Sequence, residues 1–118
     1  MILRISLVFF AGAIAYLSLA PSGTLTVGSD KIGHFIAYFV LMLNAGLIKP
    51  PSKTSLLISV IATSLYGVIM EVGQYYVPGR FMSFYDVLAN VGGVLVGLIF
   101  LLIFHSHLNR ILTALGIN

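Results

Sequence analysis

Four long apolar stretches follow one another along the 118-residue chain, separated by short segments rich in proline, glycine and charge. They cover residues 5–20, 31–48, 54–76 and 83–104, and each is near the roughly twenty residues that a helix needs to cross a hydrocarbon core. Apolar residues are continuous within each stretch and do not alternate as in a β-barrel strand. The pattern predicts an all-α polytopic membrane protein, with four transmembrane helices in an antiparallel bundle.

Composition supports one membrane domain over residues 1–118. Hydrophobic residues make up 59% of the chain and charged residues 8%, against about 25% charged residues in a soluble domain. The net charge of +3 comes without a basic run, so nucleic acid is not an expected partner. The expected partner is the lipid bilayer. The chain has no cysteine, which excludes disulfides and thiolate metal sites.

The two ends of the chain carry separate expectations. Residues 1–20 fit a retained helix, because Ala11-Gly12-Ala13 resembles a packing surface; a cleaved signal peptide starting with basic Arg4 is the alternative. Pro21 fits an export cleavage site poorly. Residues 106–118 form a short amphipathic tail that we expect on the inner membrane surface. Its apolar positions are Leu108, Ile111, Leu112 and Leu115.

The basic residues predict the orientation of the helices, because cytoplasmic loops carry an excess of lysine and arginine. With the N-terminus in the cytoplasm, four basic residues lie inside: Arg4, Lys49, Lys53 and Arg110. Only Lys31 and Arg80 then lie outside. We therefore predict a multi-pass protein with both termini inside.

This topology gathers the polar residues into one layer on the outer side. The layer holds all three acids, two of the six basic residues and one of the three histidines: Asp30, Glu71, Asp86, Lys31, Arg80 and His34. Residues three or four apart share a helix face, which gives three polar faces. These faces are Asp30-His34-Tyr38, Gly67-Glu71-Gln74 and Asp86-Asn90-Gly93-Gly97.

Glu71 is the deepest acid of the layer. It follows the uncharged run Leu56–Met70 and lies about 9 Å below the helix end, given the rise per residue of an α-helix. The helix dipole disfavours a carboxylate at a C-terminal end, so Glu71 needs a cation or a proton. Arg80 and Lys31 are the candidate cations, and His34 is a candidate partner. For charges nearest the interface, snorkelling towards water is the alternative.

Small residues predict where helix backbones approach closely. Ala89, Gly93 and Gly97 recur every four residues on the fourth stretch, a spacing typical of tight helix pairs in membranes. Gly67 can act in the same way one turn below Glu71. The fourth helix is thus expected to pack tightly at depth and to present polar side chains nearer its outer end.

The polar layer permits several kinds of chemistry. His34 with Glu71 or Asp86 can act as general acid and base. The same three can ligate a metal, but their spacing has no characteristic metal-ligand pattern, so we predict neither a metal nor another cofactor. An anionic head group or carboxylate can instead be held by three other members of the layer: Lys31, Arg80 and Asn90.

Three sequence blocks resemble the VanZ-like family of bacterial membrane proteins. They are D-K-x-x-H-x-x-x-Y at residues 30–38, E-x-x-Q followed by P-x-R at residues 71–80, and D-x-x-x-N-x-x-G-x-x-x-G at residues 86–97. The resemblance implies a protein of the bacterial cytoplasmic membrane with a shared polar site. The name-giving member is linked to resistance to the glycopeptide teicoplanin, and the resemblance does not supply a reaction.

Three functions of different classes stay open at this point. The first is binding or modification of an outer-side ligand, such as a lipid-linked cell-wall component or a glycopeptide. The second is an intramembrane enzyme that acts on a lipid head group, with His34 and either Glu71 or Asp86 as acid and base. The third is a structural or assembly module whose polar set fixes the helix register. Oligomerisation is compatible with all three.

Overall fold

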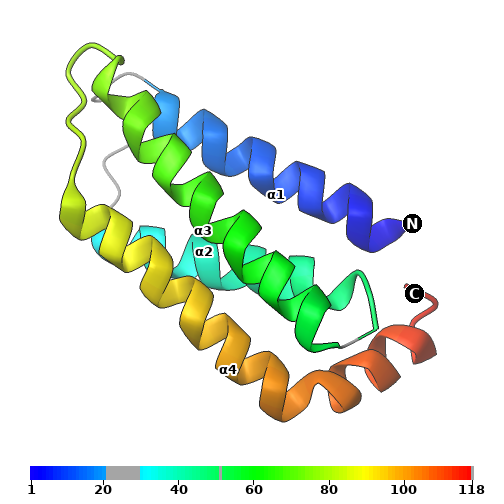
Figure 1. The fold of residues 1–118 in the computed structure, drawn as a ribbon. Helices are drawn as coiled ribbons and strands as arrows, with labels where there is room; N and C mark the ends of the chain where they lie inside the picture. Colours follow the sequence, from blue (N-terminus) through cyan, green and yellow to red (C-terminus); the bar gives the residue numbers. More distant parts are fainter. Residues whose placement is uncertain (21–29, 51, 118) are drawn as a thin grey trace.

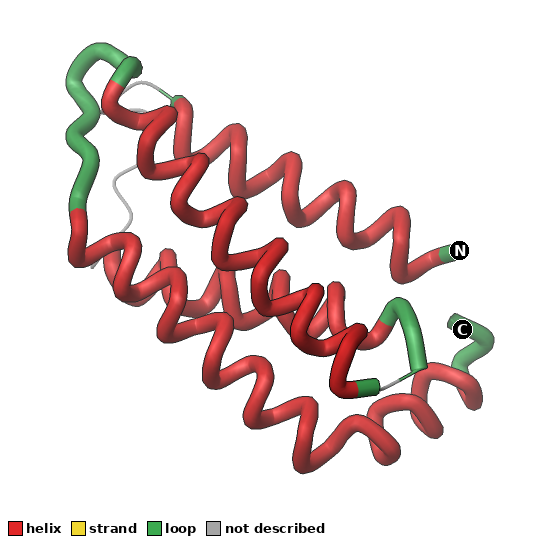
Figure 2. The backbone as a smooth tube through the Cα atoms, in the orientation of Figure 1, coloured by secondary structure: helices red, strands yellow, loops and turns green. Residues whose placement is uncertain are grey.

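The computed structural model describes residues 1–20, 30–50 and 52–117, and in these residues all regular structure is helical. The helices are α1 (Ile2–Leu19), α2 (Asp30–Leu47), α3 (Lys53–Tyr75) and α4 (Phe84–Ala114). Successive helices run in opposite directions (Figure 1), and Figure 2 shows the same course with its connecting segments. The predicted all-α antiparallel bundle is confirmed. By length and composition α1, α3 and α4 can each cross a membrane, and α2 is a shorter apolar helix.

Serine residues define the beginnings of α3 and α4. The Ser52 hydroxyl accepts a hydrogen bond from the Ser55 amide at 3.0 Å, and the Ser55 hydroxyl accepts one from the Ser52 amide at 3.1 Å. This reciprocal pair is a capping box that satisfies two amides lacking helical partners. Ser83 caps α4, because its hydroxyl accepts a hydrogen bond from the Asp86 amide at 3.4 Å.

The end of α4 differs from the prediction. The sequence predicts a helix end at residue 104 and a separate tail, whereas α4 continues to Ala114. Neither proline nor glycine occurs between residue 104 and Gly116, so the chain has no local reason to leave the helix earlier. The last turns bend away from the main axis (Figure 1). His105 is buried there and Leu108 packs on the core, so tertiary contacts also favour continuation.

Gly116 ends α4 with a C-terminal capping motif. Its φ of 68° lies in the left-handed region, which a residue without a Cβ adopts at little cost. The Ile117 amide donates to the Leu112 carbonyl at 2.9 Å, and the Gly116 amide donates to the Thr113 carbonyl at 3.1 Å. Together these bonds form the Schellman motif that satisfies the last carbonyls of a helix.

The central helix is α2, which contacts each of the other three and packs most extensively on α4. A Cβ added to Gly93 would collide with the backbone carbonyl of Phe35, and one added to Gly97 would lie 3.0 Å from the Cβ of Met42. Glycine at both positions therefore allows the backbones of α2 and α4 to approach closely. The buried apolar core around this contact consists of Ile14, Tyr38, Leu41, Met42, Leu56, Val94 and Leu101.

One end of the bundle collects the polar residues, and we call it the site end: α2 and α4 begin there, and α1 and α3 end there (Figure 1). Exposed aromatic residues surround this end: Tyr75, Tyr76, Phe81, Phe84 and Tyr85. Aromatic rings of this kind concentrate at the boundary between lipid and water. The site end therefore has the composition of a membrane interface. Elsewhere α1, α3 and α4 expose many large apolar side chains, as a lipid-facing surface does.

Candidate functional site

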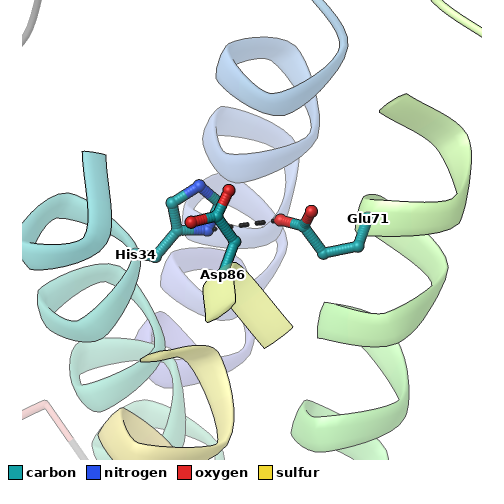
Figure 3. A group of neighbouring side chains, drawn as sticks. All are labelled: His34, Glu71 and Asp86. Atoms are coloured by element: carbon teal, nitrogen blue, oxygen red, sulfur yellow. Dashed lines mark ion pairs between the residues drawn. The ribbon is translucent and has the colours of Figure 1, made fainter. Parts of the chain in front are cut away.

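Three ionisable side chains converge inside the site end. His34 comes from α2, Glu71 from α3 and Asp86 from α4, and Figure 3 shows them pointing towards one another. Each offers one metal-ligating atom, and these atoms all lie within 4.8 Å of one another. Glu71 is completely buried and Asp86 is 6% exposed. Residues 52 positions apart in sequence thus form one compact polar cluster.

His34 is the link between the other members of the cluster. Its Nδ1 lies 2.8 Å from Asn90 Oδ1 and 3.6 Å from Glu71 Oε1. Because the amide oxygen of Asn90 can only accept, Nδ1 is the nitrogen that carries a proton in this hydrogen bond. A protonated imidazole would also form an ion pair with Glu71, the contact drawn as a dashed line in Figure 3.

Local structure holds the two carboxylates in different ways. Asp86 lies in the first turn of α4, where the positive end of the helix dipole stabilises a negative charge. Glu71 lies in the last full turn of α3, where the dipole opposes the charge. Its Oε2 instead accepts a long hydrogen bond of 3.4 Å from the Ser83 amide. The chain just before α4 therefore contributes to the site through its backbone.

A second polar layer lies one turn deeper. Tyr38 follows His34 by one turn on α2, and Asn90 follows Asp86 by one turn on α4; each is only 1% exposed. Gly67 leaves room for both, since a Cβ there would lie 3.1 Å from the Tyr38 ring and 3.3 Å from Asn90 Nδ2. Among the described residues, neither Tyr38 Oη nor Asn90 Nδ2 has a hydrogen-bond partner. The second polar layer therefore contains buried polar atoms that can still form hydrogen bonds.

Arg80 lies away from the carboxylates and stabilises α1. Its Nε donates to the Ala20 carbonyl at 2.9 Å, and a terminal nitrogen donates to the Leu17 carbonyl at 3.0 Å. These are C-terminal carbonyls of a helix, where a cation is favoured by the dipole. Arg80, one of the two candidate cations for Glu71, is thus bonded to the end of α1, and the candidate partner His34 is the cationisable group beside Glu71.

The remaining sequence-predicted site residues belong to the same three helices as the cluster. Gln74 is buried one turn beyond Glu71, and Lys31 is exposed at the start of α2. Asp30 is the first residue of α2, but its side chain lies outside the described part of the structure. Ala89 is partly exposed beside Asn90 on α4.

Sequence reasoning missed two contributors to this architecture. The Ser83 amide reaches Glu71, and no side-chain pattern marks a backbone donor. Tyr66 on α3 donates its hydroxyl to the Ala11 carbonyl of α1 at 2.5 Å. A tyrosine inside an apolar run is a usable signal, because a buried phenol hydroxyl seeks a hydrogen-bond partner.

Comparison with known proteins gives a family and no closer relative. A family model described as VanZ/LLP1 matches residues 2–105, which covers all four helices except the last turns of α4. No curated protein and no solved structure gives a significant match.

Proposed function

We propose that this protein, which belongs to the VanZ/LLP1 family, binds and modifies a lipid-linked component of the bacterial cell envelope. The observation that carries the proposal is the convergence of His34, Glu71 and Asp86 from three helices. Ionisable residues inside a membrane are costly to insert and usually line a site or a pathway. The two carboxylates and the imidazole are the groups assigned to the reaction.

The position of the cluster favours a ligand that resides in the membrane. Glu71 lies one turn below Tyr75, whose exposed ring belongs to the aromatic group of the site end. Interfacial rings lie at the level of lipid head groups. A head group anchored by its own acyl or prenyl chain reaches this level without leaving the bilayer. A lipid-linked ligand therefore fits the depth of the site better than a large soluble glycopeptide does.

The cluster offers two kinds of reactivity towards such a head group. An imidazole and a carboxylate can exchange protons with reacting oxygens, as general acids and bases do. The same donor set can also hold an ion that polarises a phosphoryl or carbonyl oxygen. In both cases His34, Glu71 and Asp86 act together, so removing any one of them impairs the site.

The proposed orientation puts the site end on the outer face of the cytoplasmic membrane, with both termini inside. It is supported by the four basic residues at the opposite side against two at the site end. Reporter fusions provide the check: a fusion after Arg110 should be active only as a cytoplasmic reporter. A periplasmic signal from that fusion would invert the site and refute an outer-leaflet ligand.

The direct test uses purified full-length protein in liposomes of phosphatidylethanolamine and phosphatidylglycerol. Undecaprenyl pyrophosphate is added as the lipid-linked probe, and mass spectrometry follows the probe over time. We expect a mass change with the native chain and its loss in Glu71→Gln and Asp86→Asn. An unchanged probe, with variants as stable as the native chain, would refute modification. If the variants instead fail to fold, the cluster is a structural network that fixes helix register.

A further inference from the structure

We propose that His34, Glu71 and Asp86 bind one divalent transition-metal ion, with Zn²⁺ or Mn²⁺ as the fitting species. The inference deepens the proposed function, because it assigns the ion through which the same three side chains would act. Only the role of the ion in the reaction depends on the proposed function. Metal binding itself follows from charge, geometry and histidine orientation at the site.

The charge at the site calls for a cation. Two carboxylates lie within 4.8 Å of each other at less than one-tenth exposure. Such a pair is stabilised either by sharing a proton or by a positive charge between the two groups. Arg80 is engaged with the end of α1, and Lys31 is exposed. A protonated His34 beside Glu71 supplies one positive charge for the two carboxylates, whereas a divalent ion balances both at once while His34 stays neutral.

The three candidate ligand atoms lie only slightly farther apart than the ligand atoms of an occupied metal site. Ligand atoms around tetrahedral zinc lie about 3.3 Å apart, given bonds of about 2.0 Å. The three candidate atoms lie within 4.8 Å of one another, so side-chain rotations of about 1 Å bring them to bonding distance. One nitrogen and two carboxylate oxygens leave at least one coordination position open. A catalytic metal site keeps such a position for water or substrate.

The orientation of His34 is the second, independent indication. Metal-bound histidines usually donate their other ring N–H to an oxygen acceptor, which fixes the tautomer and the ring plane. Asn90 Oδ1 lies 2.8 Å from His34 Nδ1 and accepts that proton. In the neutral imidazole, Nε2 then carries the lone pair available to a metal, and Glu71, whose Oε1 lies 3.6 Å from Nδ1, turns towards Nε2 to join it. Asn90 therefore performs the role of an outer partner that orients a ligand.

The Asn90 amide also shows that the cluster continues beyond these three side chains. Asn90 is 1% exposed, and its Nδ2 has no hydrogen-bond partner among the described residues. A buried amide that lacks one bond costs free energy unless a ligand or water satisfies it. This donor lies against Gly67, one turn below Glu71, where it can bond a buried water.

Donor chemistry selects the class of metal. Imidazole suits zinc and other late transition metals, and carboxylate oxygens suit manganese and magnesium. A mixed set of one nitrogen and two oxygens fits Zn²⁺ or Mn²⁺ better than Ca²⁺, which prefers six to eight oxygen ligands. Ca²⁺ is therefore the comparison ion that should bind poorly.

The test measures metal bound to the full-length protein in detergent, after removal of metal with a chelator. Equilibrium dialysis with Zn²⁺ or Mn²⁺, read by elemental analysis, should give about one ion per chain, released again by chelator. His34→Ala, Glu71→Gln and Asp86→Asn should each lower the affinity at least about tenfold. His107→Ala is the matched control, because this exposed histidine lies at the other end of α4, and its binding should not change.

A second measurement does not depend on the folding of variants. Electron spin-echo spectroscopy of Mn²⁺ bound to the native chain should show coupling to a histidine nitrogen, and the His107→Ala protein should keep that signal. Absence of saturable binding to the native protein, or equal binding in the three site variants, would overturn the inference. A chain that binds the ion but leaves undecaprenyl pyrophosphate unchanged would refute the proposed function and leave the metal site standing.

Discussion

The two ends of the bundle both bury polar side chains, but they do so with different chemistry. At the site end the buried group contains two carboxylates and one imidazole from three helices. At the opposite end, where α1 and α3 begin, Asn44 donates to the Ser6 hydroxyl at 2.6 Å. None of the three acids of the chain lies at that opposite end. The opposite end therefore buries an amide–hydroxyl pair and the imidazole of His105, and the site end buries two carboxylates beside an imidazole.

The difference shows which buried polar groups indicate function in a membrane helix bundle. Neutral hydrogen bonds between helices contribute about 0.6 kcal/mol on average and help to fix packing. Ionised groups cost several times more to insert, so a purely structural role explains them poorly. Burial alone does not separate the two ends, since Asn44 and Asp86 are both less than one-tenth exposed. The presence of carboxylates does, because the opposite end also buries an ionisable side chain, His105, but no acid.

The largest expected effect comes from Glu71→Gln, which keeps the shape of the side chain and removes its charge. We expect turnover of the undecaprenyl pyrophosphate probe to fall at least about hundredfold, because acid/base or metal assistance is lost. Stability in detergent should hold or rise, since the repulsion between Glu71 and the neighbouring carboxylate of Asp86 is removed. Turnover and thermal unfolding of the same preparation provide the measurement.

Asn44→Ala at the opposite end is the matched control for that experiment. It also removes a buried polar group, and its turnover should equal that of the native chain. If Glu71→Gln and Asn44→Ala behave alike in both turnover and stability, the functional contrast between the two ends is wrong.

Gly93→Ala should give the next largest effect, because it disturbs the close contact between α2 and α4, which lies between the two ends of the bundle. The added methyl group meets the Phe35 carbonyl on the backbone of α2, which cannot move aside alone. We expect a loss of about 2 kcal/mol or more in the free energy of unfolding. Gly92→Ala is the control: its Cβ would lie 3.6 Å from the Phe35 ring, so higher helix propensity should stabilise by up to about 1 kcal/mol.

Reversible unfolding in mixed micelles distinguishes the two glycine variants by the sign of the change. Equal destabilisation of both would show that the close approach of α2 and α4 at Gly93 is not a main source of stability.

Helix periodicity accounts for the part of the structure that the sequence predicts well. Apolar length predicts the number and order of the helices, and breaks at prolines and glycines predict most boundaries to within a few residues. Spacings of three and four residues predict which side chains share a face. His34, Glu71 and Asp86 lie together because antiparallel connections bring those three faces to one end.

Contacts between elements account for what the sequence could not predict. Nothing in the ten residues of E-V-G-Q-Y-Y-V-P-G-R shows that Arg80 would bond to carbonyls of α1, about sixty positions away. Ligands on three helices also leave no linear metal-binding pattern, since the spacing of a recognisable motif comes from a single local segment. The continuation of α4 beyond residue 104 likewise depends on packing of His105 and Leu108.

Arg80→Gln should give a smaller effect, and it tests where the arginine belongs. Loss of charged donors to the Leu17 and Ala20 carbonyls should lower the free energy of unfolding by about 1–2 kcal/mol. Turnover of the probe should stay near that of the native chain. Lys31→Gln is the control, because Lys31 is exposed and its change should be within about 0.5 kcal/mol. A collapse of turnover in Arg80→Gln at full stability would instead assign Arg80 to the functional cluster of His34, Glu71 and Asp86.

The smallest expected effect belongs to the amide–hydroxyl pair of the opposite end. Asn44→Ala or Ser6→Ala alone should cost about 0.6 kcal/mol, the average for a hydrogen bond between membrane helices. The double variant should cost clearly less than the sum, because each single change already breaks the same bond. Unfolding of all four proteins completes the cycle.

A coupling well above about 2 kcal/mol would exceed the range found for such neutral pairs. That result would show that neutral polar groups at the opposite end contribute as much free energy as the buried groups of the site end. The two ends would then no longer differ in energy. A coupling within the expected range leaves the pair of buried carboxylates, and not buried polarity in general, as the property that distinguishes the cluster of His34, Glu71 and Asp86 from the rest of the bundle.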